Sequence, residues 1–495
     1  MLPASYDPPM LEARAHQQLK ALLRGEGAQR WPHHLTLSRL VARSLRRGDH
    51  TLVRLTPGTD PSWWIGLLVP LALSDCRLAM VVSQPLRQRL LQVECPRLQA
   101  AGLELACWQG ERAPDSARLW LLSHRELLQA WRQGLLGDRQ LVIAEAELLA
   151  EHLRQAMGVR LDPADWERLR QAVPSVATSL LQLRQRLSER ILCHPRQELL
   201  AVPIPPEEEA PLRQLLQLLQ PLPAPWDQWL THSSARWTSW AQVEPALLQW
   251  QLHRQPLDPL QELAGLLQGR GAILTGELGT GIRAGEGGEA LHTDLGFTPR
   301  VSVDLGDPPL SDPLPLYAPL RQPLPNSPLF ARHLLEQCRR LVLGQARLTV
   351  VLLDDGPLRR QLTSALAAEF GRRVDQESTA PEENGVLCCR WSWWLEHQGR
   401  LPQPGQIVVA LLPIASLEDP LTAARVAALR RQGRDWFRDL LLPEALNRLQ
   451  RGLAGLRRQG GRMAVLDGRL RGRSWGRLVL EALEPWVQLP RLLPD

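Results

Sequence analysis

An α/β fold with two doubly wound parallel sheets is predicted, because short apolar runs alternate with helical patterns in two parts of the chain. The alternation spans residues 31–150 and returns over residues 331–485, as expected where crossover helices join parallel strands. Between these parts, residues 151–264 are rich in Leu, Gln and Arg and lose the strand pattern. They indicate an α-helical insertion in the first sheet domain.

The expected domain divisions follow from these changes in pattern. At 495 residues the chain has length for about three domains, each able to bury its own core. The expected parts are an N-terminal helical extension (1–30), a first sheet domain (31–150 and 265–305), the helical insertion (151–264), a proline-rich linker (306–330) and a second sheet domain (331–495).

Composition favours a globular protein of the cytoplasm. The chain is 44% apolar and 22% charged. Its first residues lack a signal pattern, and no apolar run approaches the roughly 20 residues that cross a membrane. Seven cysteines, an odd number without zinc-like spacing, fit a reducing compartment. We therefore expect no membrane segment and no metal site built from side chains alone.

Residues 52–73 have the order of a nucleotide-binding phosphate loop. Leu52–Leu55 reads as a buried strand, Thr56–Asp60 as a tight turn and Trp63–Leu73 as an apolar helix. In such a loop, glycine lets backbone N–H groups surround the phosphates, lysine reaches the outer phosphates and Ser or Thr holds magnesium. The candidate nucleotide-binding residues are Gly58, Thr59 and Ser62.

Asp60 and Pro61 stand where the loop's second glycine and its lysine belong. Asp is a favoured helix N-cap and Pro a favoured first helical residue, so this pair caps the helix with an internal carboxylate. That carboxylate would repel an incoming phosphate. Lys20 is the one lysine of the chain, so no lysine can take the missing role. The alternative is an ordinary N-capped helix that follows a strand.

Arginine is concentrated near the C-terminal end. Residues 425–477 contain fourteen arginines against four acidic residues. So dense a positive charge attracts phosphate backbones, and Arg469, Arg471 and Arg473 are the candidate nucleic-acid contacts. The alternative is a solvated helical face with scattered arginines.

Segments of the first domain resemble the DinG family of superfamily-two DNA helicases, bacterial relatives of the nucleotide-excision-repair helicase. Ser123-His124-Arg-Glu-Leu-Leu is similar to the family's Asn-His-x-x-Leu-Leu segment. Ala144-Glu145-Ala146-Glu147 falls on its Asp-Glu-Ala-His box, where the Asp positions magnesium and the Glu prepares the attacking water. Glu145 is kept, while Ala144 and Glu147 replace the Asp and the His.

The second domain carries the most specific resemblance. The family's Gln-Gly-x-Gly-Arg-x-x-Arg helix, which brings arginines to the γ-phosphate, appears from Arg451 to Arg458, with Gly455 in place of the first arginine. Four further segments match in residue type and spacing: Ile407–Ile414, Ser416–Leu421, Leu442–Leu446 and Met463–Leu470.

The resemblance implies two RecA-like sheets with an arch-like helical insertion, ATP and magnesium as cofactors, and DNA as partner. It implies Glu145 and Arg458 as the catalytic residues that remain. The family's four-cysteine iron–sulfur insertion is absent, since Cys76, Cys95 and Cys107 cannot supply four ligands.

Residues that build the sheets are kept, whereas residues that touch ATP are replaced in both domains. The leading hypothesis is therefore a DinG-like helicase homologue that binds nucleic acid, with ATP hydrolysis impaired or lost. One alternative is an active helicase that recruits another cation, Arg54 or Arg458. A second is a scaffold whose helical insertion docks a partner protein.

Overall fold

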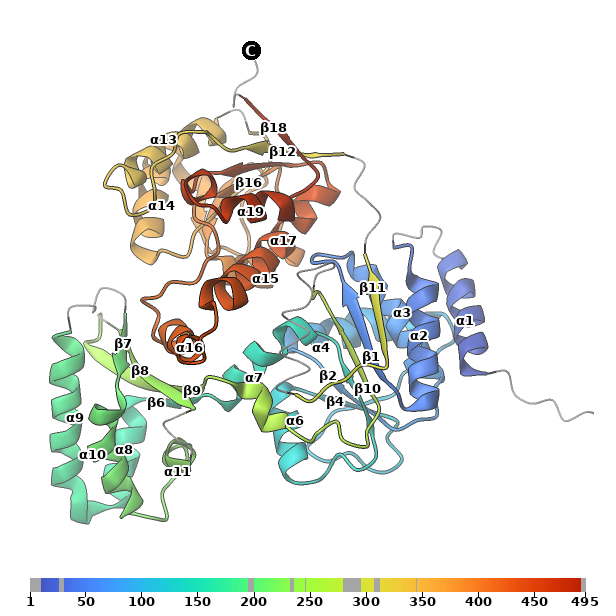
Figure 1. Ribbon diagram of the computed structural model, residues 1–495, viewed down its shortest axis with the longest axis horizontal. Helices are drawn as coiled ribbons and strands as arrows, with labels where there is room; N and C mark the ends of the chain where they lie inside the picture. Colours follow the sequence, from blue (N-terminus) through green and yellow to red (C-terminus); the bar gives the residue numbers. More distant parts are fainter. Residues whose placement is uncertain are drawn as a thin grey trace, which may run out of the picture.

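The computed structural model describes residues 10–25, 31–194, 200–231, 236–244, 246–278, 295–306, 312–343 and 345–490. Two seven-stranded sheets and one four-stranded sheet organise them (Figure 1). No helix in these ranges is both long enough and apolar enough to cross a membrane.

The first sheet is wholly parallel, with strand order β11-β1-β10-β5-β2-β4-β3. Its strands are β1 (His50–Leu55), β2 (Leu78–Val81), β3 (Cys107–Trp108), β4 (Leu119–Leu122), β5 (Gln140–Ile143), β10 (Ala272–Gly276) and β11 (Val301–Leu305). β10 lies between β1 and β5, although the whole insertion separates it from β5 in sequence. The chain therefore enters the insertion after the central strand β5 and rejoins the sheet at the neighbouring strand β10.

Helices cover both faces of this sheet, which explains why β2 and β4 are apolar at every position. One face packs against α1 (Leu11–Gly25), α2 (His34–Arg47), α3 (Trp64–Leu73), α4 (Gln84–Arg89) and α5 (Cys95–Ala100). The other packs against α6 (His124–Arg132) and α7 (Leu149–Met157). The doubly wound fold predicted for this part is confirmed.

The insertion is not purely helical, which corrects the prediction for residues 151–264. It contains an antiparallel sheet of order β6-β9-β8-β7. The strands are β6 (Val159–Leu161), β7 (Ala201–Ile204), β8 (Trp237–Glu244) and β9 (Gln249–Pro256). The helices α8 (Pro163–Ala172), α9 (Ala177–Leu192), α10 (Pro206–Gln217) and α11 (Trp226–Thr231) pack with that sheet around a Leu- and Trp-rich core.

The second sheet is also parallel, with order β14-β15-β13-β16-β17-β12-β18. Its strands are β12 (Leu314–Tyr317), β13 (Thr349–Leu352), β14 (Val374–Gln376), β15 (Val386–Cys389), β16 (Gln406–Val409), β17 (Arg462–Val465) and β18 (Trp486–Gln488). β12 falls within residues 306–330, which were expected to be a linker. The second sheet thus begins earlier in the chain than expected.

Helices again cover the two faces of the second sheet. α13 (Phe330–Val342) and α14 (Gly356–Phe370) pack on one face. α15 (Trp391–His397), α17 (Leu442–Arg458), α18 (Arg469–Gly472) and α19 (Gly476–Ala482) pack on the other. α16 (Pro420–Arg431) lies beside β7 and β8 of the insertion (Figure 1).

Candidate nucleotide cleft

The turn after β1 has the shape expected from its sequence. Gly58 has φ +81°, a backbone conformation that glycine adopts without strain. Thr59 donates both its N–H and its hydroxyl to the Thr56 carbonyl, at 3.0 and 2.6 Å. The Asp60 carboxylate accepts the Ser62 N–H at 2.8 Å, with Pro61 at the first helical position. The predicted N-cap is therefore formed, although the helix begins with one 3₁₀ turn.

One face of α17 lies against this turn. Asn447, Arg451, Ala454 and Arg458 are spaced four, three and four residues apart, so they share a helical face. Arg458 donates a hydrogen bond to the Gly58 carbonyl. A Cβ on Gly58 would lie 2.0 Å from the Cβ of Ala454. The second sheet domain thus contacts the phosphate-loop turn directly.

Glu277, just after β10, joins the two sides of the cleft. Its carboxylate forms an ion pair with Arg451 at 2.9 Å, and both side chains are about four-fifths buried, with exposed fractions of 20% and 19%. The Gly58 N–H lies near enough to the same carboxylate to act on its pKa. The Glu277 carbonyl accepts the Asn447 amide at 2.7 Å. We call Gly58, Glu277, Arg451, Ala454 and Arg458 the cleft cluster.

Burial and charge act in opposite directions in this cluster. Burial raises the pKa of Glu277, while Arg451 and the Gly58 N–H act to lower it. Burial acts to lower the pKa of Arg451, but Glu147 and Glu277 outweigh it, so that this pKa is raised. The guanidinium is held in its charged form by the carboxylates around it.

Two acidic residues that follow β5, Glu145 and Glu147, lie beside the cleft cluster and have different partners. Glu145 accepts the Ser83 N–H at 3.1 Å, so it supports the end of β2. Glu147 accepts the Glu277 N–H at 3.0 Å. Gly276 permits this approach, because a Cβ there would lie 2.4 Å from the Glu147 carboxylate. Burial, together with Glu277 and Glu145, raises the pKa of Glu147 to about 8, against the opposing effect of Arg451.

We expect Glu147→Gln to flatten the dependence of stability on pH. A carboxyl whose pKa is raised to about 8 in the folded state keeps its proton there and loses it on unfolding. The stability it contributes is therefore complete below the unfolded pKa of 4.5 and is lost as pH rises through 8. Urea denaturation midpoints at pH 5.5 and 8.5 measure this loss. Glutamine imitates the protonated acid. The two midpoints of Glu147→Gln should therefore differ less than those of wild type.

Glu383→Gln is the matched control, because Glu383 is exposed before β15. It should keep the wild-type difference between the two midpoints. An unchanged difference in Glu147→Gln would contradict the assignment of a raised pKa to Glu147.

The remaining sequence-predicted residues lie apart from the cluster. Arg54, one of the two alternative cations, pairs with Asp304 of β11 at 3.4 Å. Ser62 is partly buried, and its hydroxyl has no hydrogen-bond partner among the described residues. Within those residues, no group of three or more His, Cys, Asp or Glu is placed to hold a metal ion.

The three candidate nucleic-acid arginines differ in their surroundings. Arg469 is bonded to the buried Asp467 carboxylate at 2.6 Å. Arg471 is exposed and donates to Gln488 at 3.0 Å. Arg473 is exposed. At least six of the fourteen arginines of residues 425–477 form ion pairs, so this surface is less positive than its composition suggests.

Sequence reasoning assigned no role to Glu277 or Arg451, although Arg451 begins the segment of the second domain that resembles the family's arginine helix. They are 174 positions apart, and no local pattern connects them. Two signals in the sequence could have pointed to them. Glu277 is an acid at the end of a strand, and Arg451 stands where the family's Gln-Gly-x-Gly-Arg-x-x-Arg helix has its glutamine.

Two RecA-like parallel sheets that face each other across a phosphate-loop turn define the fold of the superfamily 2 helicases. The chain has a TM-score of 0.59 to the structure of S. tokodaii Xpd4, at 11% identity, over 90% of this chain and 97% of that one. A second structure, described as apo XPD, has a TM-score of 0.57 at 13% identity, over 92% of this chain and 100% of that one. These likenesses show the fold.

Sequence comparison names the nearer relatives. The chain is 30% identical over 125 residues to the ATP-dependent DNA helicase YoaA of Haemophilus influenzae, covering 25% of this chain and 20% of that protein. It is 34% identical over 80 residues to the 3'-5' exonuclease DinG of Bacillus subtilis, covering 16% and 9%. No protein-family model matches the chain. The chain is thus similar in sequence to YoaA and DinG over a fifth or less of these two proteins, and it shares the fold of the XPD structures.

Proposed function

We propose that this protein is a nucleic-acid-binding helicase homologue whose ATP hydrolysis is impaired or lost. The observation that carries the proposal is the position of the Glu277 carboxylate, which pairs with Arg451 across the cleft and lies near enough to the Gly58 N–H for that group to lower its pKa. In a phosphate loop such backbone N–H groups bind a phosphate oxygen. Here the Glu277 carboxylate of the chain itself stands in the place of the phosphate oxygen.

The cleft residues do not fit a triphosphate with magnesium. The Asp60 carboxylate caps the helix that a phosphate would approach, and like charges repel. Ala144 cannot supply the carboxylate that would position magnesium. Phosphoryl transfer depends on lysine, magnesium and arginine acting together, and loss of one stabilising group typically costs about 10²–10³ in rate. No step through ATP is therefore assigned to these residues.

The cations that could replace the lysine are engaged elsewhere. Arg54 pairs with Asp304, and Arg458 donates to the Gly58 carbonyl. Each guanidinium group therefore already has a partner within the protein. They favour the impaired homologue over an active helicase with a substitute cation.

Nucleic-acid binding is proposed from the relatives and from the basic surface. The Haemophilus relative is described as a DNA helicase, and Arg471 and Arg473 leave positive charge exposed on the second sheet domain. All seven cysteines are unpaired, which fits the reducing, cytoplasmic setting that we also propose.

ATP turnover measured with and without single-stranded DNA tests the catalytic half of the proposal. We expect wild type and Glu145→Gln to give the same background rate, because the cleft lacks the groups that phosphoryl transfer needs. DNA-stimulated hydrolysis that disappears in Glu145→Gln would refute it.

Binding of a labelled oligodeoxynucleotide tests the other half. Its affinity should fall steeply as salt rises, because phosphate contacts release counterions. Undetectable binding at low salt would instead favour the protein scaffold.

A further inference from the structure

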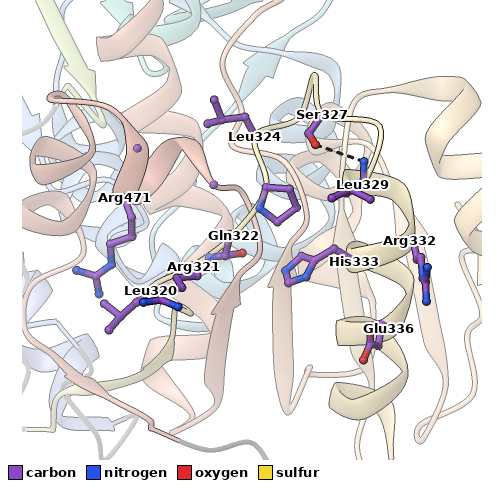
Figure 2. A pocket seen from close by; sticks show the side chains of 13 residues that line it. Leu320, Arg321, Gln322, Leu324, Ser327, Leu329, Arg332, His333, Glu336 and Arg471 are labelled. Carbon is purple, nitrogen blue, oxygen red and sulfur yellow. Dashed lines mark hydrogen bonds between the residues drawn. The ribbon is translucent and has the colours of Figure 1, made fainter.

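A crevice of about 810 Å³ in the second sheet domain belongs to the surface that is already proposed to bind nucleic acid. Arg471 lines one side of it and Arg332 lines the other (Figure 2), and Arg471 is one of the candidate nucleic-acid contacts. The first sheet domain offers a different kind of chemistry. Two free thiols, those of Cys95 and Cys107, lie close enough there for each to act on the other.

The chain reverses its direction between these two cysteines. Cys95 is the first residue of α5, whose six residues span about 9 Å. A turn follows the helix at Gly102, where φ is +75°. The six residues 101–106 can then span up to about 20 Å. The chain can therefore return to the level of Cys95 before β3 begins at Cys107.

Both thiols can be reached from solvent. Cys95 and Cys107 are half-buried and pack against the rim of the same apolar core. Their neighbours in the chain, Val93 and Trp108, are exposed. β3 has two residues and lies at the edge of the sheet beside β4. A small molecule therefore needs no opening of the core to meet this pair.

The two thiols differ in how readily they lose a proton. The Cys107 thiol has two acceptors within reach, the Leu105 carbonyl at 3.4 Å and the Sγ of Cys95. Donation from Cys107 lowers the pKa of Cys95, against the opposing effects of burial and of Glu94. The same bond, together with burial, raises the pKa of Cys107. Cys95 is therefore the thiol that ionises first, and the thiolate is the form that attacks.

We propose that Cys95 and Cys107 form a reversible dithiol–disulfide pair that reacts with small-molecule disulfides such as oxidised glutathione. The Cys95 thiolate attacks one sulfur of oxidised glutathione, forms a mixed disulfide and releases one glutathione thiolate. Cys107 then loses its proton and attacks the Cys95 sulfur, which releases the second glutathione. One protein disulfide forms, and one glutathione disulfide is reduced to two thiols, which take up the protons that the cysteines lose.

Peptide mapping of the whole protein, incubated in its folded state with oxidised glutathione, tests the pair. The remaining thiols are alkylated, and the chain is then cleaved at arginine. Cys95 lies in the resulting peptide of residues 90–97 and Cys107 in the peptide of residues 98–112. We expect a disulfide to join these two peptides, and we expect dithiothreitol, added before alkylation, to separate them again.

Serine variants distinguish the roles of the two thiols. Cys107→Ser should retain glutathione on Cys95, because the second attack is lost. Cys95→Ser should take up glutathione at Cys107 about tenfold more slowly or less, because the thiolate that attacks first is gone. Cys193→Ser is the matched control. It removes an exposed thiol of the insertion and should give the same joined peptides as wild type.

Two results would overturn the proposal. In the first, the peptides of residues 90–97 and 98–112 stay separate in wild type. In the second, Cys95 is joined to the half-buried Cys76 of the same domain instead of Cys107. Because the experiment contains neither ATP nor nucleic acid, its outcome is independent of the proposed function.

Discussion

Replacing Gly58 with alanine is expected to open the cleft between the two sheet domains. The added Cβ would lie 2.0 Å from the Cβ of Ala454, a distance at which one of the two backbones must move. The residue also has φ +81°, where a side chain costs about 1–2 kcal/mol. Since Arg451 and Arg458 reach the first domain from the same helical face, their contacts should be lost with it. Small-angle X-ray scattering should show a larger radius of gyration.

Gly102 provides the control for backbone strain. It has φ +75°, and a Cβ there would meet no atom within 4 Å. Gly102→Ala should therefore cost stability without changing the radius of gyration. Ala454→Gly should restore much of the closed arrangement in the Gly58→Ala background, because it removes the other clashing atom. A Gly58→Ala protein with the dimensions of wild type would show that this contact does not hold the domains together.

The largest loss of stability is expected from Glu209→Ala in the insertion. Glu209 forms an ion pair with Arg254, and the two side chains are 5% and 1% exposed. Ser239 donates to the same carboxylate at 2.9 Å. Removing one partner of a buried pair leaves an uncompensated charge and typically costs about 3–5 kcal/mol. Burial lowers the pKa of Arg254 to about 10, so its guanidinium would remain charged near pH 7 in this variant.

Glu207→Ala, at an exposed position of the same helix, should change stability by less than about 1 kcal/mol. Replacing both partners, as Glu209→Leu with Arg254→Met, should recover most of the loss, because apolar groups of similar volume need no counter-charge. Thermal melting measures these changes in stability, and limited proteolysis of the whole protein shows whether cleavage within residues 157–257 increases. Equal stability of Glu209→Ala and Glu207→Ala would contradict the account of the buried pair.

Local patterns in the sequence were sufficient for the two parallel sheets and for the phosphate-loop turn. The strand, turn and helix around Gly58 depend on neighbouring residues: a buried strand, a positive φ at glycine and an Asp-Pro cap. Such features lie within one turn of chain, so they can be recognised without knowledge of the tertiary fold.

The sheet of the insertion was missed for a physical reason. In β9, Trp250, Leu252, Arg254 and Pro256 alternate inward, but an inward arginine hides the period-two signal. Its charge is compensated by Glu209, which lies on a helix distant in sequence. The partnership of Glu277 with Arg451 was beyond prediction for the same reason, since it arises when two separate domains meet.

The packing of α16 against β7 and β8 has a mechanical consequence. The insertion is tied by both chain ends to the first sheet domain and rests on the second through α16, while the cleft cluster joins the two sheet domains directly. Each of the three parts of the molecule therefore contacts the other two, and their relative orientation can change only if one of these contacts is broken. Rotation of one sheet domain against the other must therefore break the contacts of α16 with β7 and β8 or the contact at Gly58.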